Sequence, residues 1–374
     1  MERRRIALKV LEKIGVSVLI VLFITIGLCY GQSGAMQHLT KGVDYAAQGK
    51  FKKAKDEFDK ALKADPFREF TKESLRIIEE VNDKRIESEP AIHFFKGVAY
   101  VMKGQYDQAI SDFTKAIELD LRFAEAYYNR GNVYLQKGGY MNQAISDYSK
   151  AIEINPRLDR AYYNRGVAYG KKGQHDKAIS DYNKAIEINP RYADAYNNRG
   201  NAWYDKGNYD RAIDDYNKAL EINPRDAGAY YNRGIAWYEK GDYDRTIDDC
   251  NKALEVNPRF ADAYINRGNA WRKKGDYDRA INDYNKALEI NPRFAAAYIS
   301  RGIAYKNKGQ YDQAISDYSK AIELNPEFAG AYNNRGNAWY EKGDYDRACS
   351  DYQKASELGN YIGLNWASKK GYCQ

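Results

Sequence analysis

Asparagine side chains recur along the chain at two regular spacings, and their amide groups could bind a peptide backbone. One series has a member about every 34 residues, with one interruption, and the other about every 68 residues. A side-chain amide carries both donors and an acceptor, which match the N–H and C=O groups of a peptide. We therefore predict that two rows of asparagines hold an extended chain: Asn129, Asn164, Asn198, Asn232, Asn266 and Asn334 in the first row, and Asn132, Asn201, Asn269 and Asn337 in the second.

Tyrosine side chains accompany these rows and would add apolar contacts to a bound peptide. They are Tyr128, Tyr163, Tyr231, Tyr204, Tyr238 and Tyr340. Asn198 and Asn201 are three residues apart, so in a helix their side chains would share one face. The alternative is that such asparagines only cap or solvate helices, and the sequence leaves both interpretations open.

Catalysis finds no support in the residue pattern. His38 and His93 stand where other copies of the pattern have an aromatic residue, and His175 lies in a turn between two expected helices. The sequence contains no spacing typical of metal ligands and no phosphate-binding loop. We therefore expect a protein that is not an enzyme and that has no catalytic residue, cofactor or metal.

The elements that carry these side chains repeat every 34 residues. A glycine marks each copy, with a single 35-residue step, at Gly97, Gly131, Gly166, Gly200, Gly234, Gly268, Gly302 and Gly336, and Gly42 marks an earlier, diverged copy. We number each copy so that this glycine is position 8. In the copy at residues 193–226, aromatic residues occupy positions 4, 11 and 24, and alanines occupy positions 20 and 27. These positions form two helical stripes, and an Asn-Pro pair ends the second helix.

This pattern resembles the tetratricopeptide repeat along residues 35–68 and 90–362. The resemblance implies an all-α fold, a right-handed superhelical solenoid of antiparallel helix pairs. It also implies a concave groove, lined by the first helix of each pair, in which other proteins bind through extended peptide segments. The asparagine rows fall at positions 6 and 9 of those first helices and look like the asparagine ladder of the O-linked N-acetylglucosamine transferases.

The resemblance leads us to expect a protein–protein interaction scaffold. Two alternatives remain open. One is a chaperone-like assembly factor for exported proteins, and the other is a regulatory or docking subunit of an enzyme complex. Acidic and basic residues alternate within each copy, so the net charge of +7 forms no basic stripe and we expect no nucleic-acid partner.

Position 7 is basic and position 23 is acidic in every copy, whereas position 7 is usually leucine in this family. The two positions lie on facing helices of one pair, so we predict a ladder of structural ion pairs, with a role in partner binding as the alternative. The predicted pairs include Arg199 with Asp215, Arg233 with Asp249, and Arg267 with Asp283.

The first 31 residues have the pattern of a signal peptide or a membrane anchor. Five basic residues between positions 3 and 13 precede an uncharged apolar run over residues 14–30. The run is slightly long for a signal core and slightly short for a membrane span. Lipid attachment at Cys29 is a third alternative. In each case the positive-inside rule places the repeats outside the cytoplasm, periplasmic, secreted, or anchored in the inner membrane by residues 14–30.

Two segments depart from the repeat. Residues 69–89 are charged and helix-favouring, and we expect an extra helix or a hinge that gives residues 35–89 some independence. Residues 363–374 are expected to form a capping helix. That helix would bring Cys373 near Cys349, so we predict a disulfide in an oxidising compartment. Cys250 replaces the aromatic residue at position 24 and is expected to lie in the core.

Overall fold

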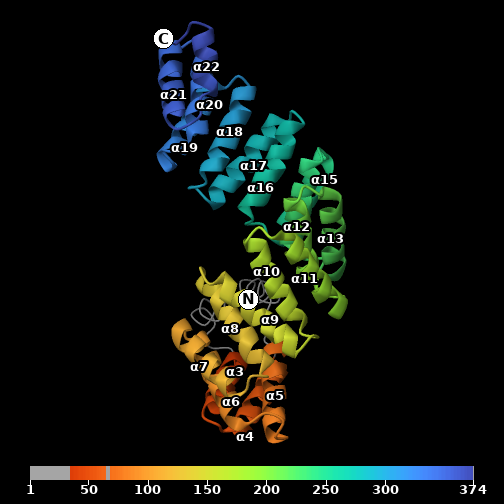
Figure 1. Ribbon diagram of the computed structural model, residues 1–374. Coiled ribbons are helices and arrows are strands. Elements are labelled where there is room, and N and C mark those ends of the chain that lie inside the picture. The colour runs from red at the N-terminus through yellow and green to blue at the C-terminus, as the bar shows by residue number, and fades with distance from the viewer. Residues whose placement is uncertain (1–33, 65–67, 374) are drawn as a thin grey trace. The chain divides into compact units, whose positions relative to one another are not determined.

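The computed structural model describes residues 34–64 and 68–373, and every regular element in these residues is an α-helix (Figure 1). The chain divides into two compact units, with the boundary between Lys206 and Gly207. The predicted all-α repeat array is confirmed.

Unit 1 contains α3 to α12: α3 Gly34–Ala47, α4 Phe51–Ala64, α5 Arg68–Asn82, α6 Ser88–Met102, α7 Tyr106–Leu119, α8 Ala124–Lys137, α9 Met141–Ile154, α10 Asp159–Lys171, α11 His175–Ile188 and α12 Ala193–Asp205. Unit 2 contains α13 to α22: α13 Tyr209–Ile222, α14 Ala227–Glu239, α15 Tyr243–Val256, α16 Ala261–Lys273, α17 Tyr277–Ile290, α18 Ala295–Asn307, α19 Tyr311–Leu324, α20 Ala329–Glu341, α21 Tyr345–Glu357 and α22 Ile362–Lys369.

The turns between helices follow from a few residues in each repeat. Asn223 ends α13 with φ −128° and ψ 86°, because the following proline disfavours helical geometry in the residue before it. Gly241, between α14 and α15, has φ +80°, which a residue with a side chain rarely adopts. The side chain of Asp242 then accepts a hydrogen bond from the N–H of Arg245 and caps α15. These signals fold each repeat into an antiparallel helix pair.

The two helices of a pair approach closely because position 8 has no side chain. In α18, a Cβ atom on Gly302 would lie only 2.7 Å from Cε1 of Tyr318 in α19. The Tyr318 side chain is fully buried, so its ring fills the space that the glycine leaves. One repeat differs: Cys250 replaces the tyrosine, and the nearest atom to a Cβ on Gly234 would be 3.4 Å away.

The first helix pair is part of unit 1 and not an independent segment. Helix α3 packs directly against α6. Leu39 and Val43 of α3 share one hydrophobic core with Phe95 of α6 and Phe113 of α7. The expectation that residues 35–89 have some independence is therefore wrong for the described residues, because their apolar faces are buried in this shared core. Most of the insert forms α5.

Within residues 34–64 and 68–373, no helix has both the length and the apolar character needed to cross a bilayer. The predicted signal peptide or anchor at residues 1–31, with Cys29, lies outside the described residues and stays a prediction.

Candidate functional site

The position-7 arginines form double hydrogen bonds with the position-23 aspartates. Arg233 Nε donates to Asp249 Oδ2 over 2.8 Å, and Nη2 donates to Asp249 Oδ1 over 2.6 Å. The structure brings together further pairs of this kind: Arg130 with Asp147, Arg165 with Asp181, Arg267 with Asp283, Arg301 with Asp317, and Arg335 with Asp351. Arg199 lies in unit 1 and Asp215 in unit 2, and their pairing stays a prediction.

The same arginines also join successive repeats. Arg233 Nη1 donates to Asn217 Oδ1 of the preceding repeat over 2.5 Å, and its guanidinium carbon lies 5.6 Å from the centre of the Tyr230 ring. Burial raises the pKa of the Asp283 carboxyl, and the hydrogen bonds from Arg267 oppose this shift. All three guanidinium nitrogens of Arg233 thus donate hydrogen bonds inside the stack. Sequence reasoning missed the contact to the preceding repeat, although Asn, Ser or Thr at position 25 was a visible signal.

In much of unit 1 the asparagine rows are buried and bonded to the protein itself. Asn164 Nδ2 donates to Asn132 Oδ1 over 3.0 Å and to the Tyr128 hydroxyl over 3.1 Å. Asn129 Nδ2 donates to the carbonyl oxygen of Glu125 over 2.9 Å. The exposed fraction is 1% for Tyr128 and Asn132 and 3% for Asn129 and Asn164. The structure therefore does not expose these four residues to a peptide as predicted, because neighbouring helices bury them.

The last asparagines of unit 1 are half-buried and joined to one another. Asn198 Nδ2 donates to the Tyr163 hydroxyl over 2.7 Å, and Asn201 Nδ2 donates to Asn198 Oδ1 over 3.3 Å. Tyr163 is buried, so it too serves the interior and not a groove. Tyr204, in α12, is half-buried.

In unit 2 the position-9 asparagines accept hydrogen bonds from the position-24 tyrosines. The Tyr284 hydroxyl donates to Asn269 Oδ1 over 2.8 Å, and the Tyr352 hydroxyl donates to Asn337 Oδ1 over 2.9 Å. Both asparagines remain half-buried. Asn266 is buried, with Nδ2 3.6 Å from the sulfur of Cys250, so the predicted peptide contact is wrong there. The other predicted residues of unit 2 lie half-buried on the first helices: Asn232, Asn334, Tyr231, Tyr238 and Tyr340.

This pairing between positions 9 and 24 predicts a difference between two substitutions. Ile303 occupies position 9 opposite Tyr318, whose buried hydroxyl has no hydrogen-bond partner among the described residues. Ile303→Asn would give that hydroxyl an acceptor, whereas Ile235→Asn would face Cys250 and gain none. We expect Ile303→Asn to be the better tolerated by about 1 kcal/mol in the free energy of unfolding, measured by urea denaturation. Equal losses in the two variants would contradict the prediction.

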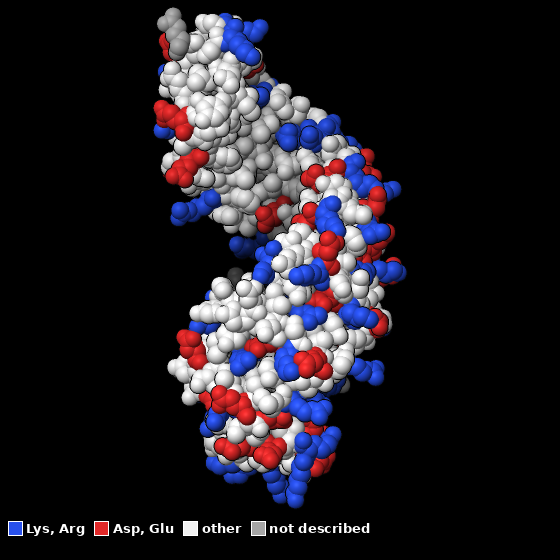
Figure 2. Space-filling view, viewed as in Figure 1, with Lys and Arg blue, Asp and Glu red and all other residues white. Residues whose placement is uncertain are grey.

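The C-terminal end of unit 2 contains a pocket of about 330 Å³ between α18, α20 and α22. Two of the predicted residues, Asn337 and Tyr340, line it together with Lys306, Glu341 and Trp366. The Tyr340 ring lies 4.8 Å from the ring of Trp366, edge to face. The pocket therefore offers an ammonium group, a carboxylate, an amide and aromatic surface to a ligand. In Figure 2 the neighbouring surface of unit 2, over α18, shows a broad area without charged side chains.

Sequence models of the tetratricopeptide repeat match residues 39–68, 97–138, 139–173, 159–192, 193–226, 227–260, 261–294, 295–328 and 329–360. The chain belongs to the tetratricopeptide repeat family. No curated protein matches it.

Several solved structures are similar to parts of this chain. A tetratricopeptide repeat protein from Parabacteroides merdae is 22% identical, with a TM-score of 0.54, over 67% of this chain and 98% of that one. The MamA protein is 31% identical, with a TM-score of 0.42, over 46% of this chain and 94% of that one. YrrB, described as a tetratricopeptide protein with an unusual peptide-binding site, is 26% identical, with a TM-score of 0.42, over 49% of this chain and 95% of that one. The first of these comparisons supports the fold alone.

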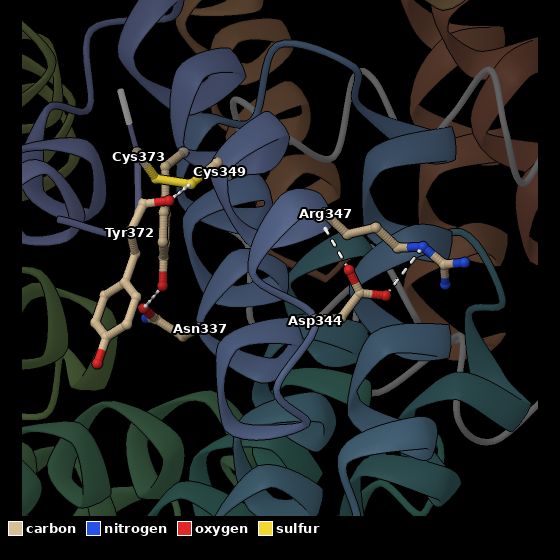
Figure 3. Close-up of a disulfide and its surroundings, with 7 residues drawn as sticks. Asn337, Asp344, Arg347, Cys349, Tyr372 and Cys373 are labelled. Atoms are coloured by element: carbon tan, nitrogen blue, oxygen red, sulfur yellow. Dashed lines mark hydrogen bonds and ion pairs between the residues drawn. A yellow bond between two sulfur atoms is a disulfide. The ribbon is translucent and has the colours of Figure 1, made fainter.

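Helix α22 caps the tetratricopeptide array and is held by a disulfide. Cys349 of α21 is bonded to Cys373, with 5.5 Å between the Cα atoms (Figure 3). A Cβ on Gly363 would overlap the Tyr352 ring, so this glycine lets α22 reach α21. In the described part of this tetratricopeptide chain, no three His, Cys, Asp or Glu side chains are grouped as metal ligands.

We expect the disulfide to stabilise the docking of the cap. The bond closes a loop with a sequence separation of 24 residues, for which chain entropy gives about 3 kcal/mol. Cys349→Ser should therefore speed hydrogen exchange in α22 while exchange in α16 and α18 stays unchanged. Titration of the unfolded chain should also find two more thiols with reductant than without it. Equal thiol counts would contradict the bond.

Proposed function

We propose that this protein is a non-enzymatic scaffold that binds segments of other proteins along the first helices of unit 2. Family membership supports a role in protein interaction. The observation that carries the choice of site is the pocket at α18, α20 and α22, where Asn337 and Tyr340 converge with Lys306 and Trp366. Lys306 and Glu341 would bind opposite charges of a partner segment, and Trp366 would cover one of its apolar side chains.

Half-buried asparagines support peptide binding along the other first helices of unit 2. Asn269 and Asn337 use their amide oxygens to hold the core tyrosines, which leaves the orientation of each amide fixed by the fold. A fixed amide loses little conformational entropy when a peptide binds. Tyr231 and Tyr238 are half-buried on the same helix, α14, and would add apolar contact area.

Photo-crosslinking tests this proposal in cells. A photoreactive amino acid would be placed at Asn334 or Lys306 on the first helices and, as a matched control, at Lys320, an exposed residue of the second helix α19 that pairs with Glu323. We expect crosslinked partner proteins from the first two positions and none from Lys320. Partners captured only from Lys320 would place binding on the opposite face.

We also propose that the repeats act outside the cytoplasm. The basic head and apolar run of residues 1–31 support export, and the disulfide at the C-terminal cap suits an oxidising compartment. Protease added to intact spheroplasts should digest the repeats while a cytoplasmic marker survives. Repeats that resist the protease until the membrane is opened would contradict the proposal.

A further inference from the structure

Helix α5 packs against α4 and α6, and its charged side chains reach the first helices of two later repeats in unit 1, α8 and α10. Arg76 of α5 forms an ion pair with Glu125 of α8. Arg160 of α10 donates to Glu73 over 3.4 Å and to Glu69 over 3.3 Å, and both acceptors belong to α5. Glu125 and Arg160 each occupy position 2 of their repeat, on the helix that lines the groove in this family. The insert therefore occupies a surface that faces the groove in other repeats.

The burial pattern agrees with this placement. Glu125 and Tyr128 of α8 are 6% and 1% exposed. In unit 2, Tyr231 at the corresponding position is half-buried and Asp262 at position 2 is exposed. Arg76 of α5 pairs with Glu125, and apolar side chains of α5 belong to the same hydrophobic core as Tyr128.

Helix α5 is amphipathic. Phe70, Ile77, Ile78 and Val81 are buried and belong to the same core cluster as Tyr128. Lys72 and Glu79, on the other side of the helix, are exposed. This arrangement is that of an amphipathic helix bound in a groove, with apolar anchors between complementary charges.

The repeat stack does not need α5 for its continuity. Helix α3 packs on α6 directly, and α5 lies outside the 34-residue period. Its docking also buries polar groups at a cost. The Ser74 hydroxyl has no hydrogen-bond partner among the described residues. Burial raises the pKa of the Glu73 carboxyl to about 7. The charges of Arg160 and Arg76 lower this pKa, whereas those of Glu125 and Glu69 raise it further.

We propose that the surface beneath α5 is a binding site for an amphipathic helix of a partner protein, and that α5 is its resident, replaceable occupant. The partner helix would carry an apolar stripe with helical spacing, acidic residues toward Arg160 and a basic residue toward Glu125. The surface lies in unit 1 and is separate from the face of unit 2 proposed above, so the two proposals succeed or fail independently.

A charge-reversal series with a peptide of residues 68–82 tests this on the full chain. Glu69→Arg with Glu73→Arg places like charges opposite Arg160 and should loosen α5. The labelled peptide should then bind at least about tenfold more tightly than to the unaltered chain, as measured by fluorescence anisotropy. Adding Arg160→Glu should remove that gain. Glu153→Arg, a reversal at an exposed residue of α9 that pairs with Lys150 of the same helix, is the matched control and should bind like the unaltered chain.

Hydrogen exchange on the unaltered chain provides a second readout that does not depend on any variant. We expect the amides of α5 to exchange faster than those of α8 and α10, and excess peptide to speed their exchange further while α8 and α10 stay protected. A scrambled peptide should have no effect. Protection of α5 equal to that of α8 and α10, unchanged by the peptide, would overturn the proposal. So would absence of peptide binding to the loosened variant when α8 and α10 keep their protection.

Discussion

Arg233→Leu is expected to lower the free energy of unfolding by about 3–5 kcal/mol, because it leaves a buried carboxylate without its partner. Asp249 is 3% exposed and accepts two hydrogen bonds from Arg233. The arginine also holds Asn217 of the preceding repeat, so its loss weakens the contact between repeats as well. Urea denaturation followed by circular dichroism measures the total, and hydrogen exchange shows whether the loss is centred on α13 to α15.

Two variants serve as controls for this prediction. Arg233→Leu combined with Asp249→Leu removes both charges, and we expect a smaller loss than for Arg233→Leu alone. Arg245→Leu removes an arginine that is 60% exposed and pairs with Asp242 at the surface, and the expected loss is below about 1 kcal/mol. A loss in the double variant as large as, or larger than, that of Arg233→Leu alone would show that the unpaired Asp249 carboxylate adds no cost.

Gly302→Ala is expected to destabilise unit 2 by about 1–3 kcal/mol through overpacking. The added Cβ would lie 2.7 Å from one carbon of the Tyr318 ring and 3.0 Å from another. The ring is fully buried, so it has no free space into which to turn. Urea denaturation of the full chain, with hydrogen exchange in α18 and α19, measures the loss.

Gly234→Ala is the matched control, at the same repeat position. Cys250 leaves room there, and the nearest atom to the new Cβ would be Asp249 Cβ at 3.4 Å. Alanine favours a helix over glycine by about 1 kcal/mol, so this variant should be neutral or more stable than the unaltered chain. Equal destabilisation by the two substitutions would show that the aromatic ring does not set the need for glycine.

The ion-pair ladder shows which contacts a repeat pattern can predict. Positions 7 and 23 carry opposite charges in every copy, and six arginine–aspartate pairs have the predicted partners. The prediction was possible because both members lie in one repeat, where the helix pair fixes their separation. The third contact, from Arg233 to Asn217, crosses to the preceding repeat and depends on the stacking between repeats.

The asparagine rows show what a repeat pattern cannot predict. Position 9 asparagines have the same sequence signature whether they bind a ligand or a neighbouring tyrosine. Asn132 and Asn164 bond to each other over 3.0 Å, a contact between successive repeats that periodicity does not distinguish from a shared exposed face. Burial at these positions depends on which side chains of the neighbouring repeat lie against them, such as Tyr128 at Asn164.

The sequence by itself determined the helix pairs, their turns, the glycine approach and the arginine–aspartate partners, because each depends on residues close together in one 34-residue unit. The tertiary structure alone decided that α5 forms ion pairs with α8 and α10, that Tyr128 and Asn129 are buried, and that Lys306, Tyr340 and Trp366 line one pocket. These features join segments that no local period relates. Their packing follows from how apolar faces and charges of distant helices fit together, which only the folded chain specifies.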